Sequence, residues 1–267
     1  MEKRGLGLQK IKIKDKILDN CLVVTFSMSE RTEELNDLCF QKLGFKNRIT
    51  LSTSDGFHDK FLKFAELACK SEYDFFIRND ADRLVFSGIL NLLDMMIKDE
   101  RLSWTTGTYY DYLMNRFRCG TPSIHRRDNL QFLVDNPSLM KDVQKPEATF
   151  ANSIKDKFKI RDVEIFTNLH EYDQYPSKVC NAFLNRLCRG HYPRLYDDNY
   201  LNGLPEHYKR AVKHAFTIYD RDGPKNSIKF KDFSFLDQNI EPLEERDLET
   251  LYRTYENLYQ KLRGSKE

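Results

Sequence analysis

The residues best suited to chemistry are two carboxylates, Asp80 and Asp82, separated by the small residue Ala81. They follow closely on an apolar segment, residues 75–77, that is typical of a buried strand. A strand ending here presents both carboxylates at its carboxyl end. There the pair is suited to hold a hard divalent cation, Mn²⁺ or Mg²⁺, which in turn neutralises a diphosphate. The alternative is an ordinary acidic turn before the next helix, because two Asp residues with this spacing often occur by chance.

A second segment whose side chains could take part in binding or catalysis is residues 175–196. It carries basic and tyrosine side chains together. Its members are Lys178, Arg186, Arg189, Arg194, Tyr175, Tyr192 and Tyr196. Arg186 and Arg189 could receive a diphosphate leaving group, and the rings could stack on a sugar. The alternative, which we favour for most members, is a solvated helix face with tyrosines packed on the core. We expect no nucleic-acid partner, because the 43 basic and 41 acidic residues nearly cancel.

Strand-like and helix-like segments alternate through about residue 107 and must position these groups. The strand-like segments are residues 21–26, 48–52, 73–78 and 102–107. Ser27 and Glu30 have the spacing of a capping box, which predicts that a helix begins here and ends before Gly44. The alternation predicts an α/β fold with a mainly parallel sheet flanked by helices. In such sheets ligands bind at the carboxyl ends of the strands.

The pattern loosens beyond residue 107. Residues 120–122 predict a turn, 146–158 a helix, 163–169 a strand, and 242–264 a late amphipathic helix. We therefore expect three parts. Residues 1–19 form a basic arm, residues 20–175 form the α/β catalytic domain, and residues 176–267 form a helical extension packed on that domain.

The order of these features resembles the nucleotide-sugar-dependent glycosyltransferases of the GT-A fold, most nearly inverting family two and its bacterial polysaccharide-synthesis relatives. The matching features are the strand and polar turn at residues 22–27, the strand at residues 49–52 followed by Asp55, and the Asp80-Ala81-Asp82 segment. The resemblance implies that Ser27 and Asp55 lie by the nucleotide base and ribose, that Asp80 serves ribose and metal, and that Asp82 binds the metal. Arg83 stands where the family often has a further Asp, so the nucleotide stays open, with UDP as the first choice.

The resemblance also implies a general base and a further metal ligand. Inverting transfer needs a carboxylate that takes the proton from the attacking hydroxyl. Glu147, which follows a Pro in the first turn of a predicted helix, matches the family's base, and Asp111 is the rival. Glu147 could instead merely complement the helix dipole. His170 matches the late His that several GT-A enzymes use as a metal ligand, although a single His is more often structural.

Composition limits the class and the compartment. The chain has 267 residues, of which 40% are hydrophobic and 31% charged, which excludes global disorder. No apolar run reaches the length of a membrane span. The six cysteines are widely spaced and contain no C-x-x-C pair, which predicts reduced thiols in a cytoplasmic protein. The basic arm could touch anionic lipid at the inner face of a membrane, or it is a solvated tail.

Together these features predict a metal-dependent, inverting glycosyltransferase that moves a sugar from a nucleoside-diphosphate sugar to a saccharide hydroxyl in polysaccharide or glycoconjugate synthesis. One alternative enzyme class is nucleotidyl or phosphoryl transfer, which also places carboxylates at strand ends. The other alternative is a saccharide-binding or scaffold protein that has the fold without turnover. The sequence leaves the donor sugar, the acceptor, the linkage and the oligomeric state open.

Overall fold

A seven-stranded sheet with the order β2-β1-β3-β6-β5-β7-β4 forms the centre of the protein. The computed structural model describes residues 15–52, 56–140, 146–188, 190, 198–227, 232–237 and 248–264. The strands are β1 (Cys21–Ser27), β2 (Asn47–Ser52), β3 (Phe75–Asp80), β4 (Arg83–Val85), β5 (Leu102–Asp111), β6 (Arg116–His125) and β7 (Lys159–His170). Strand β1 is parallel to β2 and β3, and β5 is parallel to β7, whereas the other three pairings are antiparallel. The predicted α/β class is confirmed, with a sheet that is half parallel.

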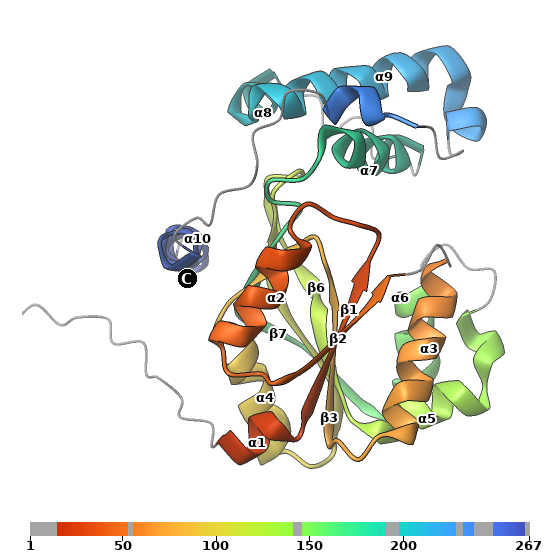
Figure 1. Ribbon diagram of the computed structural model, residues 1–267, viewed down its shortest axis with the longest axis vertical. Helices are drawn as coiled ribbons and strands as arrows, with labels where there is room; N and C mark the ends of the chain where they lie inside the picture. Colours follow the sequence, from red (N-terminus) through yellow and green to blue (C-terminus); the bar gives the residue numbers. More distant parts are fainter. Residues whose placement is uncertain are drawn as a thin grey trace, which may run out of the picture.

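Helices cover both faces of the sheet (Figure 1). One face carries α1 (Asp15–Asp19), α2 (Glu33–Lys42), α4 (Gly88–Lys98) and α10 (Leu248–Gly264). The other face carries α3 (Phe57–Lys70), α5 (Arg127–Asp135) and α6 (Pro146–Ile154). Each layer buries its apolar stripe in a separate core, one built around Phe40, Leu92 and Phe166 and the other around Phe61 and Phe64. The regular spacing of Phe57, Phe61 and Phe64 on α3 is therefore a core pattern.

A third group of helices lies over the end of the sheet at which β1 and β3 finish (Figure 1). It contains α7 (Pro176–Cys188), α8 (Asp198–Gly203) and α9 (Glu206–Ser227). Short 3₁₀ turns, η1 (Pro137–Met140) and η3 (Ser234–Asp237), complete the described elements. Phe183 of α7 and Val212 of α9 share a core with Leu113, which follows β5. The division into arm, catalytic domain and extension stays a prediction, and residues 1–14 of the arm lie outside the described residues.

None of the described helices is both long and apolar enough to cross a membrane.

Two local predictions from the sequence are wrong. Residues 120–122 lie inside β6, where the register with β5 shifts between Thr106 and Gly107. The glycine and proline therefore mark an irregularity within a hairpin strand and not its turn. Ser27 does not cap a helix, because it is the last residue of β1, and α2 begins at Glu33 after Thr32.

Two glycines lie directly against β7. A β-carbon built on Gly88, at the start of α4, would lie 1.9 Å from the carbonyl oxygen of Phe166. One built on Gly107 of β5 would lie 2.3 Å from the Cγ2 atom of Thr167. Helix α4 and strand β5 therefore approach β7 more closely than any other residue type allows at these positions.

A buried histidine, His125, sits between the sheet and α3. Its Nδ1 atom lies 3.2 Å from Asn129 Oδ1, its Nε2 atom lies 2.9 Å from Ser123 Oγ, and its ring centroid is 4.7 Å from that of Trp104. Burial lowers the pKa of His125 to about 3. The neutral ring fits these contacts, because one nitrogen can donate to the amide oxygen while the other accepts from the hydroxyl.

We expect acid to destabilise the protein through this ring. Below pH 6.5 His125 is protonated in the unfolded chain but stays neutral in the folded chain. The free energy of unfolding therefore falls with the pH, by about 1.4 kcal/mol per pH unit. Between pH 6.5 and 5 the loss from His125 amounts to about 2 kcal/mol. Urea unfolding at several pH values measures how the free energy of unfolding depends on pH. This dependence should be weaker in His125→Gln. A variant of the partly exposed His58, His58→Gln, is the matched control. Equal slopes in wild type and His125→Gln would exclude this cause.

Candidate metal centre

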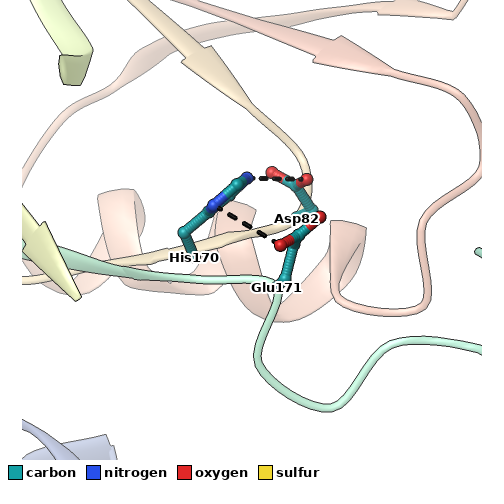
Figure 2. Close-up of side chains that lie close together, drawn as sticks. All are labelled: Asp82, His170 and Glu171. Carbon is teal, nitrogen blue, oxygen red and sulfur yellow. Dashed lines mark ion pairs between the residues drawn. The ribbon is translucent and has the colours of Figure 1, made fainter. Parts of the chain in front are cut away.

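Asp82, His170 and Glu171 converge at the end of the sheet that faces α7 (Figure 2). Their ligand atoms all lie within 4.8 Å of one another. The His170 Nε2 atom is 3.3 Å from Asp82 Oδ2, and the Nδ1 atom is 3.8 Å from Glu171 Oε2. One imidazole nitrogen and two carboxylate oxygens form a donor set that suits a divalent cation. The structure thus brings together two sequence-predicted ligands, Asp82 and His170, and adds Glu171.

Backbone contacts hold these two distant segments side by side. Asp82 lies in the tight turn between β3 and β4, where the buried Ala81 donates its amide hydrogen to the Phe26 carbonyl at 2.9 Å. The Glu171 amide donates to the Asp82 carbonyl at 2.9 Å, directly after β7 ends. Glu171 has a φ of 58°, an unusual value for this residue type, and this turns its carboxylate back toward His170. The small residue between Asp80 and Asp82 is fully buried at this turn.

Electrostatics within the cluster favour an ionised Asp82 and a protonated His170. Burial and the nearby Arg83 favour a neutral imidazole, but Asp82, Glu171 and Asp111 outweigh them and raise the pKa of His170. Burial likewise opposes ionisation of Asp82, but His170 and Arg83 hold its pKa below the usual value. The Oδ1 atom of Asp82 is buried and has no hydrogen-bond partner among the described residues. An oxygen left in this state is available to a cation, and a cation that displaces the His170 proton also gains an imidazole ligand, so the residues present fit a metal ion.

Asp111 and Arg186 contact the cluster and each other. Arg186 of α7 pairs with the Glu171 carboxylate and lies 3.6 Å from Asp111 Oδ2. The Asp111 side chain is fully buried, and it also lies 3.6 Å from His170 Nδ1 and 3.4 Å from Arg118 Nη1. Burial raises the pKa of Asp111, but His170 and Arg186 lower it by more, well below its usual range. The structure therefore gives Asp111 the contacts of a buried anion and leaves it no exposed oxygen.

Asp80 and Glu147 belong to a separate network built on Arg78. The Arg78 side chain is only 2% exposed, and its Nη2 atom lies 2.6 Å from Asp80 Oδ1. Its Nη1 atom lies 3.2 Å from Glu147 Oε2. The second Asp80 oxygen lies 3.2 Å from Arg83 Nε. The structure thus does not bring Asp80 into the cluster with Asp82, because two arginines hold both of its oxygens. Glu147 keeps a partly exposed carboxylate.

The remaining sequence-predicted donor residues divide into two groups. Ser27 is buried, and its hydroxyl contacts the carboxylates of Glu30, at 3.1 Å, and Glu33. Its carbonyl accepts a hydrogen bond from Lys60 Nζ at 2.7 Å. Asp55 and Arg189 lie outside the described residues.

A pocket of about 170 Å³ opens between the cluster, the loop after β1, and α7. Its acidic lining residues are Glu30, Asp82 and Glu171, and its other polar lining residues are Gln174, Lys178, Asn181 and Asn185. Burial raises the pKa of Glu30. Because carboxylates and side-chain amides line the same small space, the pocket can hold a hydroxyl-rich group beside the candidate metal centre.

Sequence reasoning missed Glu171, Glu30 and Arg78 as parts of these sites. Glu171 directly follows His170, so the adjacent pair His-Glu at a strand end was the available signal. Glu30 was assigned to a capping box, although it contacts Ser27 across a loop. Arg78 carried no signal, because a basic residue inside an apolar strand gives no indication of its partners.

The fold and the cluster define an α/β protein with a candidate divalent-cation centre at the carboxyl end of a parallel pair of strands. No protein-family model matches the sequence, and no curated protein sequence matches it. Solved structures resemble it in part. A197 from STIV has a TM-score of 0.43 and 14% identity, over 54% of this chain and 81% of that chain.

Two further structures carry names of transferases. A glycosyltransferase involved in the glycosylation of the major capsid of PBCV-1 has a TM-score of 0.39 and 10% identity, over 56% of this chain and 92% of that chain. A cytidylyltransferase from Leptospira borgpetersenii has a TM-score of 0.36 and 11% identity, over 84% of this chain and 98% of that chain. At these TM-scores the similarities define no family for the chain.

Proposed function

We propose that this protein is a metal-dependent glycosyltransferase that moves a sugar from a nucleoside-diphosphate sugar to a saccharide hydroxyl. The observation that carries the proposal is the cluster of Asp82, His170 and Glu171 beside a pocket with amide side chains. A divalent cation held there would neutralise charge on the diphosphate leaving group. The mixed nitrogen and oxygen donor set favours Mn²⁺ over Mg²⁺ in this proposal.

The other residues receive roles from their surroundings. Glu147 is the proposed base, because its side chain is 29% exposed and can therefore meet an acceptor hydroxyl. Asp111 is proposed to position His170 and Arg186 instead, since its carboxylate is fully buried. Arg186 is proposed to meet the diphosphate next to Glu171. Asp80 and Ser27 are proposed to shape the donor site through their neighbours, and Asp55 and Arg189 keep their proposed donor contacts.

Thermal unfolding with nucleotides tests the donor and the metal together. The ligands are UDP, GDP, CDP and their common sugars, each with Mn²⁺, with Mg²⁺ or with a chelator. A ligand at about 100 times its dissociation constant adds roughly 2.7 kcal/mol of stability, which corresponds to about 5 to 10 °C for a chain of this size. We expect such a shift for one nucleotide in the presence of metal. Asp82→Asn should abolish it.

The matched control is Asp94→Asn, which removes the same charge from α4, where Asp94 pairs with the exposed Lys98. That variant should keep the full shift. No shift with any nucleotide would contradict the proposal. Release of pyrophosphate from a nucleoside triphosphate and a sugar phosphate, without hydrolysis of any nucleotide sugar, would assign nucleotidyl transfer instead.

A further inference from the structure

A second pocket, of about 590 Å³, lies between β6, β7 and α10. It shares no lining residue with the pocket beside the candidate metal centre. Its volume falls in the range of about 300 to 1,000 Å³ that is typical of small-molecule sites. The proposed function assigns no role to this space.

Three arginines from two elements converge on this pocket. Arg116 and Arg118 are alternate residues of strand β6, so their side chains leave the strand on the same face, and Arg263 comes from the last turn of α10. Arg116 is exposed and forms no ion pair within the part of the chain that the structure describes. Arg263 lies 3.2 Å from the carboxylate of Glu164, the one acidic lining residue, and its side chain remains 48% exposed. The pocket thus carries an excess of positive charge.

Apolar side chains form the rest of the pocket wall. Phe117 and Tyr259 lie with their ring centroids 5.0 Å apart, and Leu262, which is 47% exposed, lies beside them. Large exposed aliphatic residues next to aromatic rings offer a surface for the apolar part of a ligand. Charge and apolar surface therefore occur together in one open pocket.

We propose that this pocket binds a small organic anion that carries a phosphate on an apolar or ring-shaped body. Guanidinium groups bind phosphate through paired hydrogen bonds, and Arg116 of β6 and Arg263 of α10 present two such groups to the pocket. The body of the ligand lies on Phe117, Tyr259 and Leu262. Arg116 contributes most, because Arg118 already faces Asp111 at 3.4 Å and Arg263 already faces Glu164 at 3.2 Å.

Calorimetric titration with 1-naphthyl phosphate in the presence of a chelator tests the proposal, since the chelator silences any metal-dependent site. Inorganic phosphate and 1-naphthol are titrated separately, because each represents one part of 1-naphthyl phosphate. We expect one saturable site for 1-naphthyl phosphate and much weaker binding of either half. Arg116→Gln and Arg263→Gln should each weaken binding about tenfold, the loss expected for one charge-assisted contact. Arg116→Glu should abolish binding.

Two variants serve as controls. Arg253→Gln removes an exposed arginine of α10 that pairs with Glu249 and does not line the pocket. Asp82→Asn removes the candidate metal ligand. Both should bind 1-naphthyl phosphate as wild type does, whatever their effect on nucleotide binding, so this test is independent of the proposed function. The proposal is overturned if no saturable site exists, if Arg116→Gln binds with unchanged affinity, or if 1-naphthol binds as tightly as its phosphate.

Discussion

Replacing Arg78 with Met is expected to lower the free energy of unfolding by about 3 to 5 kcal/mol, the usual result of removing one partner of a buried ion pair. Arg78 is 2% exposed and faces both Asp80 and Glu147. It also donates to the Thr121 hydroxyl and lies over the Phe57 ring at 4.8 Å. Without it, Asp80 and Glu147 lose the cation that they share, and among the described residues Arg83 alone is left to compensate Asp80.

The measurement is urea unfolding followed by the fluorescence of Trp104, the single tryptophan, which is buried. Arg48→Met is the matched control, because Arg48 pairs with the half-exposed Asp37 at the surface. We expect the control to lose less than about 1 kcal/mol. Arg78→Lys keeps the charge but not the forked geometry of the guanidinium. Its loss in free energy of unfolding should lie between those of Arg78→Met and Arg48→Met. A loss below about 1 kcal/mol in Arg78→Met would show that the network does not hold this end of the sheet.

Replacing Arg186 with Met is expected to make the stability of the protein strongly dependent on Mn²⁺. Arg186, Glu171 and Asp111 are all nearly buried, so the loss of the guanidinium should cost about 3 kcal/mol when no metal is bound. A cation among the remaining carboxylates replaces the lost positive charge, and the repulsion between Arg186 and that cation disappears. Added Mn²⁺ should therefore raise the Tm of the variant more than that of wild type.

Thermal unfolding with and without Mn²⁺ measures this difference. Arg253→Met, which breaks an exposed pair with Glu249, should change neither the Tm nor its dependence on Mn²⁺. A second variant, Glu171→Gln, removes a proposed ligand and should lose the Mn²⁺ effect. An equal Mn²⁺ shift in wild type and Arg186→Met would mean that no cation binds next to this guanidinium.

Much of the fold was predictable because its signals are local. The apolar strand that becomes β1, the phenylalanine spacing of α3 and the segment that becomes β3 are each set by nearby residues. The antiparallel half of the sheet was not predictable, since the partners of β6 depend on contacts between distant segments. The three-residue strand β4 was missed because it is too short to show a period.

The candidate site shows the same division. Asp82 stood out through its place after a strand, and His170 through a family pattern, and both lie in the cluster. Asp80 looked equivalent to Asp82 in the sequence, but the chain turns between them, and Asp80 faces Arg78 and Arg83. Ion-pair partners that lie 69 residues apart, as Arg78 and Glu147 do, leave no trace in sequence spacing.

The position of His170 depends on two glycines, which have no β-carbon. Gly88 and Gly107 let α4 and β5 close onto β7 at Phe166 and Thr167, a few residues before the strand ends in His170. A slip of β7 by one residue would remove the Phe166 carbonyl and the Thr167 side chain from these two contacts, and it would turn His170 to the opposite face. The two glycines thus fix the register of β7 against α4 and β5. They fix the reach of His170 and Glu171 toward Asp82 through contacts at Phe166 and Thr167.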